Sequence, residues 1–463
     1  MVFSSLTFLW VFLPVVLIVY FLSKEKFYNI ILVAASLVFY AWGEPVYILL
    51  MLASIIINFF AGLSLGGGTP QRKRIFLALA IIINLSLLGY YKYADFLLAN
   101  VNYIFQINIP MPRVTLPIGI SFYTFHSISY LVDIYRGQNA PQKNIIKMGL
   151  YISIFPALIA GPIIKYHDIK RQLDFRRTSL NKFNAGVYRF IAGLGKKVLI
   201  ANVAAKTADA VFALSPSQYG MATAWIGILA YTLQIYFDFS GYSDMAIGLG
   251  KMFGFNIKEN FDYPYISQSI KEFWRRWHIS LSTWFKEYLY IPLGGNRQGA
   301  ARTYINLLIV FFATGLWHGA SWNFVVWGLF HGTFLVIERV VSVESILRFR
   351  FMRNAYVLFV VITGWVFFRS DTLLQAFQFL GKMFSFKSGS EGLFYLSSEL
   401  IIILSVGFLA GGFFQLANTS FLKNRFYRKF LLAARPVFLC AVFFLCILYI
   451  ANNTYSPFIY FRF

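Results

Sequence analysis

The stretch LTFLWVFLPVVLIVYFL, residues 6–22, carries no charge and is followed directly by SKEK at residues 23–26. A helix needs about 20 apolar residues to cross the roughly 30 Å hydrocarbon core of a bilayer. Lipid cannot bond exposed backbone groups, so such a stretch spans the bilayer as a helix. It lacks the basic start and small-residue cleavage site of a signal peptide, and we expect it to be retained. Lys24 and Lys26 predict an outside N-terminus and a cytoplasmic first loop.

Apolar blocks like this one recur along the whole chain. Hydrophobic residues make up 59% of the sequence and charged residues 13%, about half of the roughly 25% that is usual in soluble domains. We therefore predict an all-α, polytopic integral membrane protein with about 11–13 membrane helices, including short or re-entrant ones. The loops are short, which predicts a single membrane domain over residues 1–463. The further blocks are residues 28–42, 47–65, 75–90, 116–135, 149–164, 183–212, 222–250, 304–317, 322–337, 355–368, 397–417 and 430–451.

The net charge of +23 could indicate a nucleic-acid partner, but the placement of the charge argues against one. The basic residues form short clusters between apolar blocks, as cytoplasmic loops facing anionic membrane lipids do. One such cluster contains Arg348, Arg350 and Arg353. The two cysteines, Cys440 and Cys446, lie in one apolar block and predict core residues rather than a disulfide.

The segment KEFWRRWHISLSTWFKEYLYIPLGGNR, residues 271–297, mixes charges and aromatic rings too densely to cross lipid. Its apolar positions recur at helical spacing, which predicts an interfacial helix or one packed into the protein at the cytoplasmic face. His278 lies in this segment beside Arg275 and Arg276. The residues alone favour an ordinary interfacial histidine and leave open a polar group at the mouth of a substrate tunnel.

A second histidine, His318, lies in GLWHGASWNFVVWGLFHG, residues 315–332. An ionisable residue at the end of an apolar block is costly and is a functional candidate. A neutral imidazole can take a proton from a hydroxyl or thiol, and Trp317 and Trp322 could wall a pocket around it. A buried histidine that is merely hydrogen-bonded fits the local sequence equally well. No histidine pair has metal-ligand spacing, so we predict no metal site.

The stretch QIYFDFSGYSDMAIG, residues 234–248, places carboxylates inside an apolar block. On a helix Gln234, Asp238 and Tyr242 share one stripe. Buried carboxylates need partners, and we expect Arg275, Arg276 or the histidines to supply them. An ion-coupled transporter is the competing interpretation, although such proteins usually show inverted repeats, and none is evident here.

Five long motifs together resemble the membrane-bound O-acyltransferases, specifically the bacterial alginate O-acetylation type. They are LPIGISFYTFHSISYLVDIYRG, FPALIAGPI, LQIYFDFSGYSDMAIGLGKMFGF, ENFDYPYISQSIKEFWRRWHISLSTWFKEYLYIPLGGNR and GLWHGASWNFVVWGLFHG, within residues 116–332. The resemblance implies a helical fold around a central tunnel, in a bacterial cell membrane. By this resemblance His318 is the catalytic base and His278 is the second polar position. Candidate substrate-binding residues are Trp317, Trp322, Arg275, Arg276, Asp238 and Tyr242.

The same resemblance predicts a membrane O-acetyltransferase that takes acetyl from cytoplasmic acetyl-CoA for an extracytoplasmic polysaccharide, such as an alginate-like or cell-wall polymer. A partner serine-type (SGNH-like) acetyltransferase outside the membrane would modify the polymer, because this chain has no soluble catalytic domain. The tail TYSPFIYFRF, residues 454–463, contains Tyr460, which the resemblance makes a candidate covalent acyl relay. An interfacial aromatic anchor is the alternative for Tyr460. Transfer of another acyl group, such as D-alanine to teichoic acid, is the alternative for the activity.

Overall fold

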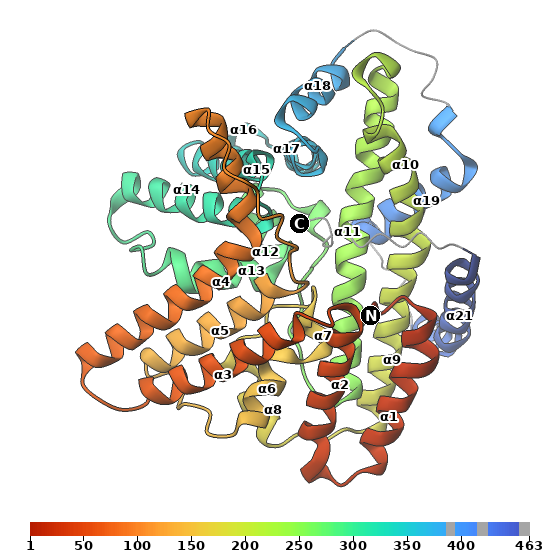
Figure 1. Ribbon diagram of the computed structural model, residues 1–463. Coiled ribbons are helices and arrows are strands. Elements are labelled where there is room, and N and C mark those ends of the chain that lie inside the picture. Colours follow the sequence, from red (N-terminus) through yellow and green to blue (C-terminus); the bar gives the residue numbers. More distant parts are fainter. Residues whose placement is uncertain (386–393, 414–424, 453–463) are drawn as a thin grey trace. The chain divides into compact units, whose positions relative to one another are not determined.

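The protein is described here from a computed structural model, and the structure describes residues 1–385, 394–413 and 425–452. Every regular element in these ranges is helical (Figure 1), and the predicted polytopic all-α class is confirmed. Six helices are long and apolar enough to span a membrane: Glu25–Gly43, Ile48–Leu65, Pro70–Phe105, Gly299–His318, Arg350–Arg369 and Ala433–Asn452. The other predicted blocks, as far as the structure describes them, are shorter, more polar or only partly helical.

The chain forms two compact units, each assembled from two separate stretches. The first unit contains Met1–Phe190 and Met245–Lys258, and the second contains Ile191–Asp244 and Glu259–Phe463. Helices α9 (Leu180–Gly195) and α11 (Met221–Met252) each contribute to both units. The predicted assignment of residues 1–463 to one membrane domain remains a prediction.

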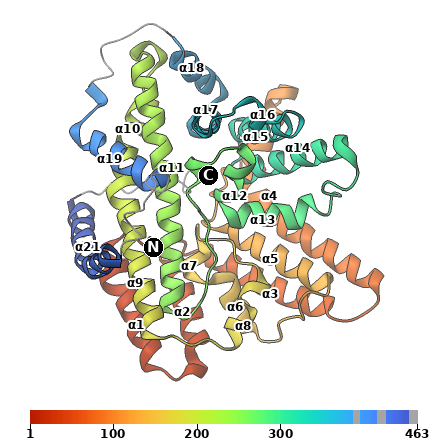
Figure 2. The same ribbon diagram turned by 180° about the vertical axis from the view of Figure 1, so that it is seen from behind.

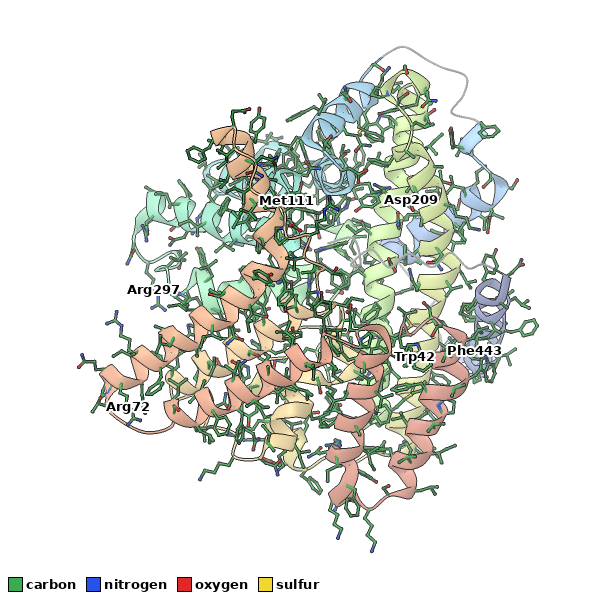
Figure 3. The ribbon with its side chains drawn as sticks, in the orientation of Figure 1. Trp42, Arg72, Met111, Asp209, Arg297 and Phe443 are labelled. Atoms are coloured by element: carbon green, nitrogen blue, oxygen red, sulfur yellow. The ribbon has the colours of Figure 1, made fainter. Side chains whose placement is uncertain are left out.

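The first unit is built from the helices of the N-terminal third of the chain. The longest is α4, whose 36 residues extend for about 54 Å at 1.5 Å per residue. Figure 3 labels Arg72 at the start of α4 and Met111 in the loop beyond its end. The elements are η1 (Phe8–Phe12), α1 (Leu13–Leu22), η2 (Glu25–Phe27), α2 (Tyr28–Gly43), α3 (Ile48–Leu65), α4 (Pro70–Phe105), α5 (Ile120–Tyr135), α6 (Ile145–Ser153), α7 (Phe155–Leu158) and α8 (Tyr166–Asp174).

Polar pairs inside apolar helices hold the first unit together. Asn58 of α3 and Asn84 of α4 exchange amide hydrogen bonds of 3.1 and 2.9 Å, and both side chains are buried.

At its N-terminus α4 is capped by Thr69, whose hydroxyl accepts from the backbone N–H of Arg72, and Pro70 occupies the first helical position. Proline suits this position because the missing N–H has no partner in a helix start.

The second unit contains the described C-terminal half of the chain, which Figure 2 shows from behind. Its elements, besides parts of α9 and α11, are η3 (Lys196–Ala201), α10 (Asn202–Phe212), η4 (Pro216–Gln218), η5 (Pro264–Ile266), α12 (Ile270–Arg276), α13 (Ile279–Phe285), η6 (Lys286–Tyr290), α14 (Gly299–His318), α15 (Trp322–Val340), α16 (Val343–Ile346), α17 (Arg350–Arg369), α18 (Leu373–Met383), α19 (Ser398–Phe408), η8 (Leu409–Phe413) and α21 (Arg425–Asn452).

Helices α14 and α15 form a tight hairpin in the second unit. A Cβ atom at Gly315 would collide with the carbonyl oxygen of Phe324, and one at Gly328 would collide with that of Phe311. Glycine at both positions therefore lets the two backbones approach closely, as small residues do in membrane helix pairs. Ser321 caps α15 by accepting from the backbone N–H of Asn323. His318 is the last residue of α14 and so lies at the closed end of the hairpin.

Two lysine–carboxylate pairs join α11 to η3 in the second unit, and the pair that Lys197 forms is buried. Lys197 lies 2.7 Å from Asp238, and Lys196 lies 2.7 Å from Asp244. The side chains of the first pair are 4% and 1% exposed, so neither charge is left without an opposite charge in the low-dielectric interior. Lysines of η3, rather than the predicted Arg275 or Arg276, therefore neutralise these carboxylates.

Candidate active site

His318 is buried among aromatic rings at the C-terminal end of α14. Only 4% of the surface of His318 is exposed. The ring centroids of Trp317, Trp327 and Phe368 lie 4.9, 5.0 and 5.1 Å from that of His318, all at steep interplanar angles. The partial negative charge at a helix C-terminus stabilises a positive charge placed there. The end of α14 is therefore a suitable place for an imidazole that gains a proton.

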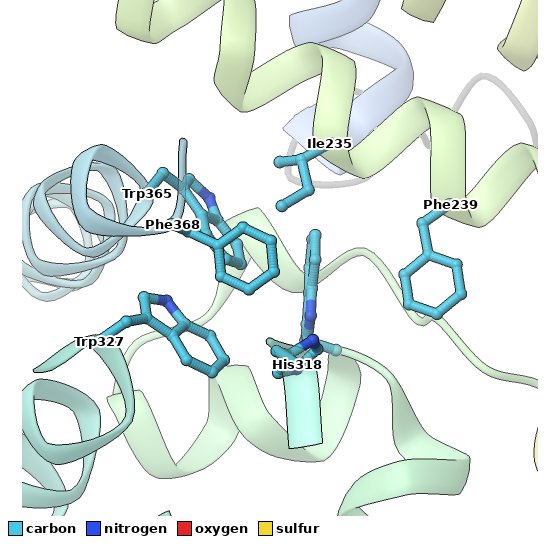
Figure 4. A pocket seen from close by; sticks show the side chains of 7 residues that line it. Ile235, Phe239, His318, Trp327, Trp365 and Phe368 are labelled. Atoms are coloured by element: carbon cyan, nitrogen blue, oxygen red, sulfur yellow. The ribbon is translucent and has the colours of Figure 1, made fainter. Parts of the chain in front are cut away.

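A small cavity lies directly beside the His318 ring. Figure 4 shows Trp327 of α15 and Trp365 and Phe368 of α17 on one side, with Ile235 and Phe239 of α11 across from them. The cavity measures about 10 Å³, which is room for about one water molecule. This space is therefore too small for an acetyl group in the conformation described.

His278 is held in an unusual backbone conformation at the start of α13. Its φ of 44° and ψ of 54° are left-handed, a region that non-glycine residues rarely adopt and that often marks functional positions. The residue is fully buried. This burial agrees with the predicted packing of residues 271–297 into the protein.

Asn260 determines how His278 presents its ring. The Asn260 Oδ1 atom lies 3.2 Å from Nδ1 of His278 and accepts the backbone N–H of Ser280 at 3.1 Å. An amide oxygen can only accept, so Nδ1 of His278 donates and the lone pair of the neutral ring lies on Nε2. Nε2 is buried and has no hydrogen-bond partner in the part of the chain that the structure describes. Burial lowers the pKa of His278 to about 3, which keeps the ring neutral.

Trp317 connects the two histidines. Its ring centroid lies 4.9 Å from that of His318 and 6.0 Å from that of His278. Phe239, which lines the small cavity, also meets His278 edge-on at 4.6 Å. The structure thus brings His318, His278 and Trp317 together, in one cluster within the second unit.

None of the other predicted substrate-binding residues lines the small cavity beside His318. Trp322 begins α15 and is 52% exposed. Arg275 is exposed, and Arg276 pairs with Glu272 at 2.9 Å and Asp262 at 3.2 Å. Tyr242 and Asp238 are buried on α11. Tyr460 lies outside the described residues.

Several residues of the cluster could not be chosen from the sequence. Trp277, Trp327, Trp365 and Phe368 line the cavity, and Asn260 orients His278. Asn260 belongs to the quoted ENFDYP run, which is the one signal that pointed towards it. Trp365 and Phe368 lie on α17, beyond the motif region that ends at residue 332. Across the described ranges, no three His, Cys, Asp or Glu side chains gather as metal ligands would.

Comparison with known proteins identifies the family of this chain. A family model described as "MBOAT, membrane-bound O-acyltransferase family" matches residues 138–369. The chain belongs to the membrane-bound O-acyltransferase family. Its matched region contains both histidines and the aromatic residues around them.

Three relatives show where the chain lies within the membrane-bound O-acyltransferases. A probable alginate O-acetylase of Azotobacter vinelandii is 47% identical over 83% of this chain and 78% of its own length. A probable alginate O-acetylase of Pseudomonas putida is 42% identical over 100% of both chains. A peptidoglycan O-acetyltransferase of Helicobacter pylori is 38% identical over 86% of this chain and 82% of its own length. The chain is thus an acyltransferase and a multi-pass protein of a bacterial membrane, and these relatives support membrane O-acetylation.

Proposed function

We propose that this acyltransferase takes acetyl from cytoplasmic acetyl-CoA and passes it across the membrane for O-acetylation of an extracytoplasmic polysaccharide. His318 is the general base of this reaction. The observation that carries the proposal is the buried cluster of His318, Trp317 and His278 beside the small aromatic cavity. Two relatives named for alginate O-acetylation and one named for peptidoglycan O-acetylation support the acyl group and the polymer class.

The cluster supplies what acyl transfer from a thioester needs. His318 takes the proton of an attacking hydroxyl, whose oxygen forms a bond to the acetyl carbonyl carbon. The carbon–sulfur bond breaks, coenzyme A leaves as a thiolate, and the proton held by His318 passes to that sulfur. A general base of this kind contributes about 10²–10⁴-fold to rate. The surrounding rings exclude water, which limits hydrolysis of the thioester.

The hydroxyl that attacks is assigned to Tyr460 in the C-terminal tail. A phenol ester formed there would then transfer acetyl to the serine of an extracytoplasmic SGNH-like acetyltransferase, and the phenol would recover its proton. This assignment rests on the aromatic tail 454–463 and the family resemblance. The partner accounts for modification of a polymer that lies outside the membrane.

The decisive experiment follows radiolabelled acetyl from acetyl-CoA into the chain, in membranes that contain wild type or His318→Gln. The glutamine keeps a polar side chain but cannot act as a base near neutral pH, so labelling should become about 10²–10⁴-fold slower. His167→Gln is the matched control, because His167 is 37% exposed and lies in the first unit. Equal labelling of wild type and His318→Gln would refute the assignment of the base.

A second experiment tests the relay alone. Tyr460→Phe keeps the ring and removes the hydroxyl, so acetyl should no longer remain attached to the chain, while His318 is intact. Mass spectrometry of the C-terminal peptide after incubation with acetyl-CoA should find the acetyl group on Tyr460 in wild type. Normal polymer acetylation in cells that carry Tyr460→Phe would show that the relay is wrong even if His318 is the base.

The alternatives differ in the acyl group and in the class of protein. D-alanine transfer to teichoic acid predicts labelling from activated D-alanine and none from acetyl-CoA. An ion-coupled transporter would need Asp238 and Asp244 to bind an ion, yet each carboxylate pairs with a lysine of η3 at 2.7 Å. The paired lysines favour the enzyme over the transporter.

A further inference from the structure

A second cavity in the second unit is far larger than the one beside His318. It measures about 560 Å³ and lies among α11, α17, α19, η5 and η8. Most of its lining is aliphatic or aromatic, and six of the residues that form it are Leu229, Leu233, Leu358, Ile362, Leu404 and Phe408. A cavity of this size and composition takes an apolar ligand.

The polar side chains of the lining offer no hydrogen to a ligand. The Thr232 hydroxyl donates to the Ile228 carbonyl oxygen at 2.7 Å, and the Ser405 hydroxyl donates to that of Ile401 at 2.9 Å. The Tyr265 hydroxyl donates to the Thr232 carbonyl oxygen at 2.7 Å. With its donors used in this way, the cavity favours a hydrocarbon chain over a sugar or a nucleotide.

The cavity is continuous with the surface that faces lipid. Phe408 and Leu409 line it and are also 49% and 56% exposed. Ile401 and Ile402 on the same apolar helix are 50% and 60% exposed. In a membrane protein such a surface contacts the acyl chains of the bilayer, so a lipid chain can enter without crossing water.

We infer that this cavity binds one acyl chain of a membrane phospholipid. The bound acyl chain would be separated from the cluster of His318, His278 and Trp317 by one pair of aromatic side chains. Tyr265 lines the large cavity, Trp365 lines the cavity at His318, and the Trp365 indole donates to the Tyr265 hydroxyl at 3.2 Å. A bound lipid chain therefore packs against the outer side of the active-site wall.

Photolabelling tests the site without using acetyl transfer. The purified full chain is placed in vesicles of phosphatidylethanolamine and phosphatidylglycerol that contain phosphatidylglycerol with a diazirine on one acyl chain. After irradiation, mass spectrometry should locate cross-links on α11, α17 and α19 at residues that line the cavity. Leu404→Trp fills the space and should reduce these cross-links about tenfold, the factor that 1.4 kcal/mol produces.

Matched variants distinguish a filled cavity from a misfolded protein. Ile402→Trp adds the same bulk to the same helix at a residue that is 60% exposed, and should leave the cross-links unchanged. Ile362→Ala enlarges the cavity and should keep them. Equal labelling of Leu404→Trp and wild type at the cavity residues overturns the proposal.

A further arm tests the kind of lipid. Labelling by a polyprenyl phosphate probe, with none by the phospholipid, would show that the cavity binds a carrier lipid and would overturn the assignment to phospholipid.

Discussion

The histidines of the two units differ in how their ring nitrogens are satisfied. In the first unit His126 accepts the backbone N–H of Ile164 at Nε2, at 3.1 Å, and His167 lies 3.2 Å from both Asp133 and Asp168. In the second unit Nε2 of His278 and both ring nitrogens of His331 have no hydrogen-bond partner among the described residues. Nδ1 of His126 is likewise buried without a partner among the described residues, so the two units differ most clearly at His331, whose two ring nitrogens both lack one.

We expect this difference to mark where the chemistry takes place. A buried polar group without a partner costs about 1–3 kcal/mol, and native proteins keep such groups mainly at functional sites. The unsatisfied nitrogens of His331 lie beside the aromatic walls that surround His318, since the Trp327 ring is 5.0 Å from His318 and 5.3 Å from His331. Substitutions at these histidines can test whether the two units divide structure and catalysis in this way.

The largest effect should come from removing the ring nitrogens of His278. His278→Phe keeps an aromatic ring in the fully buried position but offers nothing at Nε2 to the reacting groups. Loss of a preorganised polar group in an acyl-transfer site costs about 10²–10³-fold, and the rate of acetyl labelling from acetyl-CoA should fall by that factor. Labelling at the wild-type rate would place His278 outside the reaction.

The same kind of substitution should have opposite consequences for stability at His126 and His331. His126→Phe removes the acceptor of the buried Ile164 N–H, so the free energy of unfolding should fall by about 1–3 kcal/mol. His331→Phe removes two nitrogens that have no partner in the described chain, so stability should stay within about 0.5 kcal/mol of wild type or rise. Denaturant unfolding in detergent, followed by tryptophan fluorescence, measures both changes.

Equal losses of stability in these two variants would remove the distinction between the units. A stable His331→Phe protein with slower acetyl labelling would sharpen it, because it would show that an unsatisfied imidazole is retained for function at a cost in stability. His167→Gln serves as the control, since its side chain is 37% exposed and its partners are carboxylates.

The sequence predicted the outline of the second unit better than its details. Uncharged blocks of about 20 residues are sufficient to predict membrane helices, because burial in lipid depends on local composition. His318 could be chosen because its motif is contiguous and contains the glycines that the α14–α15 hairpin requires. The partner of Asp238 and the role of Asn260 depend on contacts between residues 41 and 18 positions apart, respectively. No local pattern specifies such contacts, so Lys197 and Asn260 were not predicted.

A smaller effect should come from the aromatic wall of the second unit. Phe368 lies 5.1 Å from His318 and lines the cavity of about 10 Å³. Phe368→Ala removes a ring and enlarges the space, so the ratio of propionyl to acetyl transfer should rise by about tenfold, the value of roughly one methylene in a hydrophobic pocket. Competition between propionyl-CoA and acetyl-CoA measures the ratio, and Phe377→Ala, at a residue 57% exposed on α18, is the control. An unchanged ratio would mean that Phe368 does not limit the size of the acyl group.

The smallest predicted effect is a pH dependence of stability that comes from His278. Burial lowers the pKa of His278 to about 3, from an ordinary value of 6.5. Between these values the unfolded chain binds a proton that the folded chain does not, so stability falls as the pH falls below 6.5. Between pH 6.5 and pH 5.5 the loss from this group should be about 1 kcal/mol. Over this interval, the free energy of unfolding of wild type should fall by that amount relative to that of His278→Phe. A difference that stays constant with pH would show that His278 is hydrated in the folded protein, and Nε2 would then resemble the satisfied nitrogens of the first unit.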